Sequence, residues 1–353
     1  MLNFGLLHTH DIYMRRCLQF AELGAGNVAP NPMVGAVLVY EDQIIGEGYH
    51  QQYGQAHAEV NCINHVPEHF QQLISKSTLY VSLEPCNHFG KTPPCSDLII
   101  KHEIPNVVIA CRDSFEKVNG SGIKKLKDAG VNVMLGILEK EALELNKRFF
   151  CFHTNQRPYI ILKWAQSNDG MIAHADHSSI KISNEFTDRL VHKWRSEEAA
   201  IMVGTKTGLY DNPSLTTRLW PGKDPVRVVI DKYLKLPASH NLLDNKVQTI
   251  ILNSIKQDED DNNNYYKLGE NENMIAVTIN ILRQRNLTSL IVEGGTELIQ
   301  SFIEANCWDE ARVIANRNMI LGNGIAAPVL ENKLLFKKEA LHTNEICFYK
   351  NCQ

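Results

Sequence analysis

Apolar residues in the first part of the chain recur with two periods, one typical of helices and one typical of strands. The pattern predicts a helix over residues 12–23, capped by Thr9 or Asp11, followed by a hairpin of two strands, 34–40 and 43–50. Further strands are expected at 78–84, 106–111 and 131–135. Further helices are expected at 57–65, 95–102, 120–130 and 139–150. This alternation predicts an α/β domain whose strands pair mostly in parallel after the hairpin.

A polar connector at 151–158 is expected to separate two domains, residues 1–150 and 151–353. The second domain shows the same alternation of periods. Its strands are expected at 159–166, 199–204, 226–231, 248–253, 289–295 and 310–316, and its helices at 184–198 and 296–306. The acidic, Asn-rich stretch 257–266 is predicted to be an exposed loop without chemistry. A length of 353 residues agrees with two hydrophobic cores rather than one.

The composition narrows the class of protein. Hydrophobic residues make up 44% of the chain and charged residues 22%, which is ordinary for a globular protein. A formal net charge of −4 gives no electrostatic footprint for nucleic acid or for an anionic membrane. No apolar run reaches the ~18 residues that a spanning helix needs, and the N-terminus lacks the pattern of a signal peptide. Nine scattered cysteines predict reduced thiols and therefore a cytoplasmic protein.

Three residues of the first domain have the chemistry of zinc ligands. His57 opens a predicted helix, and Cys86 and Cys95 flank a Gly/Pro-rich loop between a strand and a helix. A catalytic zinc takes three protein ligands and leaves a fourth position for water, whose pKa it lowers towards ~7–9. Glu59 is expected close to the metal without being a ligand, where it can move the proton of that water to a leaving nitrogen.

The order of these residues is that of zinc nucleobase deaminases, in which His-x-Glu precedes Pro-Cys and a second cysteine. Eight residues separate Cys86 from Cys95 here, where the deaminase pattern has two. A closed structural zinc site or unrelated buried cysteines are the alternatives to a catalytic site. His88, inside the loop, is a competing ligand.

Longer motifs around these residues extend the comparison. The segments APNPMVGAVLV (29–39), GEGYHQQYGQAHAEV (46–60) and SLEPCNHFGKTPPCSDLII (82–100) resemble the deaminase half of the bifunctional riboflavin-biosynthesis deaminase–reductases. In the second domain, LKWAQSNDG (162–170), MVGTKTGLYDNPSLTTR (202–218) and SLIVEGGTELIQSF (289–302) are similar to the reductase half. The resemblance implies a cytidine-deaminase-like three-layer α/β/α domain that binds one zinc ion. It also implies a dihydrofolate-reductase-like α/β domain that binds NADPH.

The resemblance further implies two consecutive reactions. The first removes the 2-amino group of 2,5-diamino-6-ribosylamino-4(3H)-pyrimidinone 5′-phosphate. The second reduces the ribosyl group with NADPH and gives 5-amino-6-(ribitylamino)uracil 5′-phosphate.

The resemblance also assigns residues in the second domain. For NADPH it implies Ala165, Thr207, Asp211, Gly295, Thr296, Glu297, Leu298, Ile299, Gln300 and Ser301. For the substrate it implies Ser179, Arg195, Leu215, Arg218 and Glu293. A Gly-Gly turn before a helix suits a phosphate, and two arginines suit the phosphate of a nucleotide. A solvated helix charge is the alternative for Arg195.

Three departures from the family pattern affect these assignments. Lys181 and Lys232 stand where many members have a tryptophan and a small hydroxyl residue, and a lysine at either position can meet a phosphate of the cofactor. The alternative is that both lysines are solvated and contact no ligand. Residues 113–116 read DSFE where DPNP is usual. Two prolines are lost, so the family pattern does not fix the geometry of this loop on the substrate side.

Two other functions remain possible from the sequence. A nucleic-acid base deaminase fits the metal motif, but the missing basic patch argues against it. A second domain that serves dimerisation or regulation in place of reduction is allowed by Lys181 and Lys232. A small-molecule nucleotide is the expected partner, with a homo-oligomer formed through the second domain as a further possibility.

Overall fold

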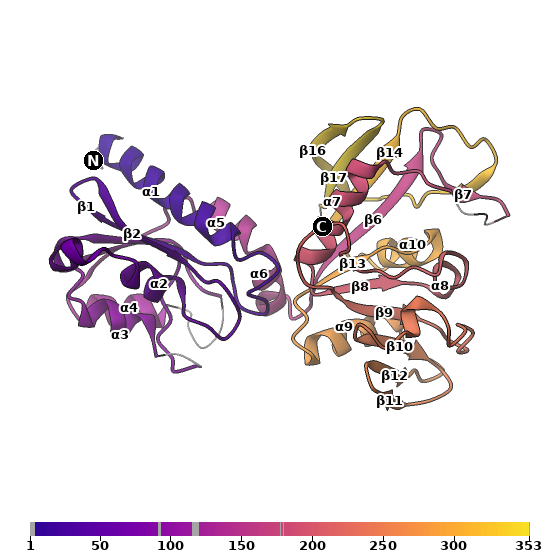
Figure 1. Ribbon diagram of the computed structural model, residues 1–353, viewed down its shortest axis with the longest axis horizontal. Coiled ribbons are helices and arrows are strands. Elements are labelled where there is room, and N and C mark those ends of the chain that lie inside the picture. Colours follow the sequence, from indigo (N-terminus) through magenta and orange to yellow (C-terminus); the bar gives the residue numbers. More distant parts are fainter. Residues whose placement is uncertain (1–3, 91–92, 115–119, 177, 179, 353) are drawn as a thin grey trace. The chain divides into compact units, whose positions relative to one another are not determined.

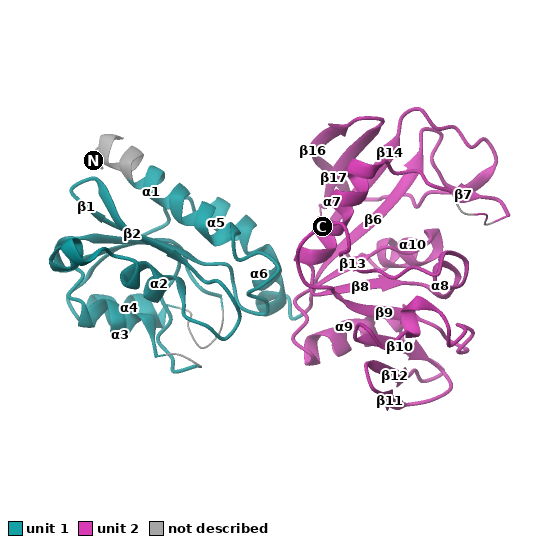
Figure 2. Cartoon of the chain, in the orientation of Figure 1, with its two compact units in different colours: residues 1–156 teal, residues 157–353 magenta. Residues whose placement is uncertain are grey.

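The computed structural model describes residues 4–90, 93–114, 120–176, 178 and 180–352. The chain forms two compact units, residues 1–156 and 157–353 (Figure 2). The boundary expected at 150/151 falls inside helix α6 (Lys147–Thr154), whose Phe149, Cys151 and Phe152 are buried. Both units are α/β, as expected from the sequence.

Unit 1 contains a five-stranded sheet with the order β2-β1-β3-β4-β5. The strands are β1 (Gly35–Tyr40), β2 (Gln43–Tyr49), β3 (Thr78–Leu83), β4 (Asn106–Cys111) and β5 (Asn132–Leu135). The hairpin of β1 and β2 is confirmed, and its turn places Glu41 and Asp42 at positive φ, 45° and 64°. β3, β4 and β5 pair in parallel, as predicted.

Helices cover both faces of this sheet (Figure 1). They are α1 (Phe4–Glu22), α2 (Ala58–Asn64), the 3₁₀ helix η1 (Glu68–Lys76), α3 (Cys95–Lys101), α4 (Ser121–Asp128), α5 (Glu139–Leu145) and α6. One core joins α2, α3 and α4 to the sheet through residues such as Ala58, Ile99 and Leu126. The other joins α1 and α5 to the opposite face through Met14 and Ala142. The three layers predicted for this domain are therefore present.

Two predicted helix limits in unit 1 are wrong. α1 already begins at Phe4, so Thr9 and Asp11 lie inside the helix and do not cap it. The single helix expected over 139–150 is divided at Asn146, which has φ −100° and ψ 22°. Its side chain bonds the backbone of Met33 twice, accepting from N and donating to O at 2.8 Å each, and this tertiary contact competes with a continuous helix.

Unit 2 contains a ten-stranded sheet with the order β11-β12-β10-β9-β8-β13-β6-β14-β17-β16 (Figure 1). Its strands are β6 (Tyr159–Ser167), β8 (Ala200–Val203), β9 (Val226–Ile230), β10 (Thr249–Asn253), β11 (Asp258–Asp260), β12 (Asn263–Lys267), β13 (Ser289–Val292), β14 (Glu310–Asn316), β16 (Lys333–Leu341) and β17 (Asn344–Asn351). The strands from β12 to β14 run parallel, and the outer strands are antiparallel.

Helices and a small sheet complete unit 2. The helices are α7 (Glu185–Glu197), α8 (Thr205–Asp211), η2 (Asn241–Leu243), α9 (Met274–Gln284) and α10 (Thr296–Glu304), and the small sheet pairs β7 (Met171–His174) with β15 (Gly324–Ala326). The capping box of Asn184 and Thr187 begins α7. Phe302 and Trp308 are among the largest buried side chains of the core.

Residues 257–262 are exposed, as the composition predicted, but the stretch 257–266 is not a loop. It forms β11 and β12, and β12 pairs in parallel with β10. Asn263 and Asn264 are buried there because each has a partner: Asn263 Nδ2 donates to Leu243 O at 3.3 Å, and Arg285 donates to Asn264 Oδ1. The prediction from polar composition alone therefore missed the two strands at one edge of the sheet.

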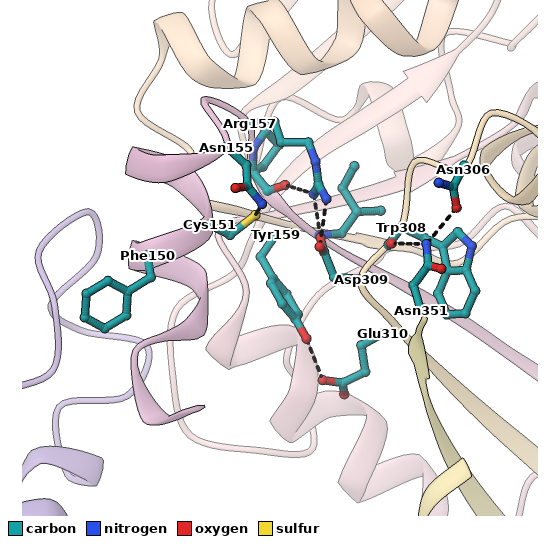
Figure 3. Close-up of polar contacts among 12 residues, drawn as sticks. Phe150, Cys151, Asn155, Arg157, Tyr159, Asn306, Trp308, Asp309, Glu310 and Asn351 are labelled. Atoms are coloured by element: carbon teal, nitrogen blue, oxygen red, sulfur yellow. Dashed lines mark hydrogen bonds and ion pairs between the residues drawn. The ribbon is translucent and has the colours of Figure 1, made fainter. Parts of the chain in front are cut away.

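Unit 2 begins with a polar junction between β6 and β14 (Figure 3). Arg157 donates to both carboxylate oxygens of Asp309, at 2.6 and 2.8 Å. The same carboxylate accepts from Ile160 N at 2.8 Å, and Tyr159 OH donates to Glu310 at 3.2 Å. These bonds fix the register at which the first strand of the unit enters the sheet.

Within the described parts of the chain, none of the helices has the length and apolar character that crossing a membrane requires.

Candidate active sites

The three predicted zinc ligands meet at one end of the unit 1 sheet. His57 precedes α2 as its N-cap residue, Cys86 follows β3, and Cys95 is the first residue of α3. His57 Nδ1 lies 3.5 Å from Cys86 Sγ and 3.3 Å from Cys95 Sγ. All three ligand atoms lie within 4.8 Å of one another. Zinc–sulfur and zinc–nitrogen bonds of about 2.3 and 2.0 Å fit a donor set of this size.

The electrostatics of this donor set favour a bound cation. Hydrogen bonding from the Cys95 thiol and from His57 lowers the pKa of Cys86 to about 4. The backbone N–H of Cys95 also donates to Cys86 Sγ, at 3.4 Å. The same contact with Cys86 raises the pKa of His57. A thiolate stabilised in this way is the form that binds metal.

Glu59 lies beside the donor set but outside it. It occupies the first turn of α2, and its side chain is buried. Burial raises the pKa of Glu59, and the neighbouring Cys86 raises it further. A raised pKa makes this carboxylate a better proton acceptor, as general acid–base catalysis requires.

His88 is not part of the group of metal-binding side chains found among the described residues. A histidine that our sequence reasoning did not single out, His50, instead lies next to the site. Its ring is 5.4 Å from that of His57 and roughly perpendicular to it. His50 Nδ1 donates to Ala56 O at 3.0 Å, and Nε2 accepts from Asn31 at 3.2 Å. Burial lowers the pKa of His50, so its ring is neutral. Its bond to Ala56 O fixes the backbone of the residue that directly precedes His57.

In unit 2, Glu293 follows β13 at the centre of a buried ion-pair group. Its two oxygens accept from Arg195 Nε at 3.0 Å and Nη2 at 2.7 Å, and Lys163 Nζ is 3.3 Å away. Burial alone would raise the pKa of Glu293, but the charges of Arg195 and Lys163 outweigh it and bring the pKa to about 2. The side chain of Arg195 is only 13% exposed, so it is not a solvated helix charge.

The other predicted substrate residues differ in how exposed they are. Leu215 is buried at a positive φ of 53°, and Arg218 is exposed and donates to Thr216 Oγ1 at 3.0 Å. Arg218 and Arg195 share a neighbour, His192, whose pKa falls to about 4 through burial and then through the two guanidinium charges. The structure thus places both arginines near His192, together with the carboxylates of Glu293 and Asp188. Ser179 lies outside the described residues.

The predicted cofactor residues centre on the turn before α10. Thr207 Oγ1, on α8, accepts from Gly295 N at 3.1 Å and ties the two elements together. The first backbone N–H groups of α10 have no partner within the helix, which suits a phosphate. Asp211 is the last residue of α8, and desolvation by neighbouring groups raises the pKa of its carboxyl although the residue is exposed at the surface. Ala165 lies on β6, in register with Ile314 of β14.

Side chains along α10 differ in what they reach. Leu298 and Ile299 belong to the hydrophobic core, so only their backbones can face a ligand. The side chains of the other four bond nearby groups: Thr296 to Ala326 O, Glu297 to Lys206, Gln300 to Val329 N and Ser301 to Leu298 O.

Both lysines that depart from the family pattern have protein partners. Lys181 Nζ pairs with Asp188 at 3.0 Å while 70% of its side chain is exposed. Lys232 Nζ lies 5.5 Å from the centre of the Tyr233 ring. Neither contact is strong enough to prevent a phosphate from attracting the ammonium group.

Fold and sites together define a two-domain enzyme with a zinc-binding deaminase unit and a reductase unit. Residues 7–111 match the zinc-binding region of cytidine and deoxycytidylate deaminases, and residues 158–348 match the RibD C-terminal domain. The chain belongs to the RibD family of riboflavin biosynthesis proteins. It is a bifunctional hydrolase and oxidoreductase of that pathway, which confirms the function expected from the sequence.

Relatives and solved structures agree over nearly the whole chain. The riboflavin biosynthesis protein RibD of Aquifex aeolicus is 38% identical over 89% of this chain and 88% of its own length. That of Bacillus amyloliquefaciens is 40% identical over 85% of this chain and 82% of its own. The crystal structure of a diaminohydroxyphosphoribosylaminopyrimidine deaminase/5-amino-6-(5-phosphoribosylamino)uracil reductase from Thermotoga maritima superposes with a TM-score of 0.90. It is 31% identical and covers 98% of this chain and 100% of its own.

Proposed function

We propose that unit 1 deaminates 2,5-diamino-6-ribosylamino-4(3H)-pyrimidinone 5′-phosphate with one zinc ion held by His57, Cys86 and Cys95. The convergence of these three ligand atoms within 4.8 Å is the observation that carries the proposal. A bound zinc ion would supply a Lewis acid that acidifies a water molecule. Support for the substrate comes from the activity for which the similar Thermotoga maritima protein is named.

Glu59 is the proposed proton carrier of this step. Its carboxylate takes a proton from the attacking water and passes it to the 2-amino nitrogen, which leaves as ammonia when the C2–N bond breaks. The raised pKa of Glu59 supports both halves of this transfer. The neutral ring of His50 holds the backbone at Ala56 and so keeps His57 in place.

Unit 2 is proposed to reduce the ribosyl group, with NADPH supplying a hydride to C1′. The N-terminus of α10, Thr207 and Asp211 would hold the cofactor, and Ala165 would line its site. Glu293, kept ionised by Arg195 and Lys163, can still accept one pyrimidine N–H group on the remaining lone pair of Oε1. Arg218 is exposed and free to turn towards the 5′-phosphate, whereas Arg195 acts on the substrate through Glu293.

Two further assignments complete the proposal. A cytoplasmic location is supported by the nine cysteines, none of which forms a disulfide.

Association of two copies through unit 2 is supported by β16, the last strand of the sheet, on which Leu334, Leu335 and Phe336 are exposed in succession. Sedimentation analysis of the wild type and of Leu335→Lys tests the association, which predicts a dimer only for the wild type.

The order of the two reactions is tested by leaving out the cofactor. Without NADPH, the enzyme should release one ammonia per substrate and accumulate the deaminated ribosylamino compound, identified by mass spectrometry. Adding NADPH should then convert that compound to the ribityl product. If no ammonia appeared until NADPH was present, reduction would precede deamination and the proposed order would be wrong.

A further inference from the structure

Glu84 is a buried carboxylate of unit 1 that the proposed chemistry does not use. It follows β3 directly and stands two residues before Cys86, and only 4% of its surface is exposed. Its oxygens accept four backbone N–H groups from a segment distant in sequence. Oε2 accepts from Asp113 N at 3.4 Å and Gly120 N at 3.0 Å, and Oε1 from Gly122 N at 3.0 Å and Ile123 N at 3.2 Å.

This arrangement requires an ionised carboxylate. A carboxylate offers about four acceptor sites and no donor, which matches four N–H groups. Gly122 and Ile123 belong to the first turn of α4, where the helix dipole favours a negative charge. A glutamine in this place would turn an NH₂ group towards two of the N–H donors and lose those bonds.

The turn after Glu84 is held against α4 by close backbone contact. A Cβ atom on Gly122 would lie 1.9 Å from Pro85 O, so a side chain at this position would push the two segments apart. Asn87 Nδ2 also donates to Ser121 O at 3.5 Å. Residues on both sides of Cys86 therefore contact the start of α4.

The same turn is tied to α3, which begins with Cys95. Ser96 N donates to Cys86 O at 3.1 Å, and Ser96 Oγ donates to Asn87 Oδ1 at 3.3 Å. α3 and α4 are in turn joined at the surface by Lys125 and Asp97, 2.6 Å apart. The position of Cys86 relative to Cys95 thus depends on how the turn is seated between the two helices.

We propose that Glu84 is a positioning residue of the metal centre, which seats the Pro85–Asn87 turn on α4 and so sets the place of Cys86 Sγ. This inference rests on the proposed zinc-binding role of Cys86. Groups that support metal ligands without touching the metal typically change metal affinity by about 10- to 100-fold when they are replaced. Glu84 acts on the metal through Cys86 and takes no part in proton transfer.

The test compares zinc affinity, by chelator competition, in the wild type and in Glu84→Gln. We expect Glu84→Gln to bind zinc about 10- to 100-fold more weakly, with kcat for ammonia release recovering towards the wild-type value at saturating zinc. NADPH-dependent reduction of deaminated substrate should be unchanged. Asp128→Asn is the matched control, because it also turns a carboxylate into an amide on α4 but lies exposed at the far end of that helix.

Two more variants distinguish the positioning role from a general effect on the stability of unit 1. Ile109→Val removes a methyl group from the buried core on β4 and lowers the melting temperature without touching the turn. Gly122→Ala displaces the turn by another route and should also weaken zinc binding. If zinc affinity in Ile109→Val fell as much as in Glu84→Gln at equal loss of melting temperature, the positioning role would be overturned.

The outcomes distinguish this inference from the proposed function. If the wild type bound no zinc, the zinc role of His57, Cys86 and Cys95 would be wrong. If the wild type bound zinc and Glu84→Gln bound it as tightly as Asp128→Asn, Glu84 would have no positioning role. Should Glu84→Gln fail to fold, unchanged zinc affinity in folded Gly122→Ala would overturn the inference in the same way.

Discussion

The two candidate sites differ in how their charged groups are neutralised. In unit 1 a thiolate, a thiol and an imidazole converge, and the arrangement is suited to a divalent cation from outside the chain. In unit 2 the central carboxylate of Glu293 is already neutralised by Arg195 and Lys163. In the proposed function the first site is completed by a zinc ion, whereas the second is preorganised by the protein's own ion pairs. The variants below are chosen to break or sharpen this difference.

The largest effect is expected from replacing a metal ligand. Cys86→Ser or Cys95→Ser should remove the zinc and abolish ammonia release, because three ligands are the minimum of a catalytic zinc site. Reduction of deaminated substrate should persist, since unit 2 has its own core. Metal analysis and both assays on one preparation measure this. Loss of both activities in a fully folded variant would indicate a shared site.

Glu59→Gln should lower ammonia release by about 10²–10⁴-fold, because glutamine keeps the shape but cannot carry a proton. Zinc should stay bound at wild-type stoichiometry. Glu68→Gln, an exposed glutamate at the start of η1, is the control and should change neither quantity. Loss of metal in Glu59→Gln would show that this residue is a ligand, contrary to its proposed role.

Breaking the ion-pair group in unit 2 should cost stability as well as activity. Glu293→Gln leaves Arg195 and Lys163 buried without a counter-charge, and such a change typically costs about 3–5 kcal/mol. Denaturant unfolding monitored in unit 2 measures it. Asp258→Asn, which breaks the exposed pair with Lys256, should stay within about 0.5 kcal/mol of the wild type. Equal effects of the two variants would contradict a preorganised reductase site.

Acid should remove the same stabilisation. The folded pKa of Glu293, about 2, is lower than the ordinary value of 4.5, so the contribution is fully present above pH 4.5. It should be lost as the pH falls from 4.5 to 2, and a shift of this size corresponds to roughly 3 kcal/mol. Unfolding free energies of wild type and Glu293→Gln should therefore converge in acid. A constant difference across this range would rule out Glu293 as the titrating group.

The smallest effect concerns the choice of cofactor. We expect NADPH to be preferred over NADH, and Lys232→Ser to weaken the preference by up to about tenfold, equivalent to 1.4 kcal/mol. Lys181→Ser should change it less, because Lys181 already pairs with Asp188 and is largely exposed. The ratio of kcat/KM for the two cofactors decides this. Equal use of both by the wild type would remove the preference itself.

The metal site was predictable from sequence because its chemistry resides in residue types. A histidine and two cysteines are residue types that zinc prefers, and although 29 positions separate His57 from Cys86, the elements that carry them have clear periodicity. The supporting contacts were not predictable in this way. Four backbone donors reach Glu84 from residues 113–123, and Asn146 finds Met33 across 113 positions, so no local pattern records them.

The reductase site shows the limit more clearly. Lys163 and Glu293 are 130 residues apart, and sequence reasoning placed Glu293 at the pyrimidine without its two cationic partners. The strands β11 and β12 were missed because buried asparagines look like loop residues until their partners are known. Backbone sites such as the start of α10 carry little residue identity beyond glycine. The Gly-Gly turn before the helix was therefore only a weak signal for a phosphate site, and the assignment of individual cofactor residues rests on the family resemblance.

The central claim is that the deaminase site is completed by one zinc ion while the reductase site is not metal-dependent. Removing zinc with a chelator and restoring it in measured steps, with both activities followed on the same sample, tests this directly. We predict that ammonia release falls to background and returns in proportion to zinc, reaching its full value at one ion per chain, while reduction of deaminated substrate stays constant throughout. Full ammonia release from zinc-free enzyme, or parallel loss of both activities, would contradict the account.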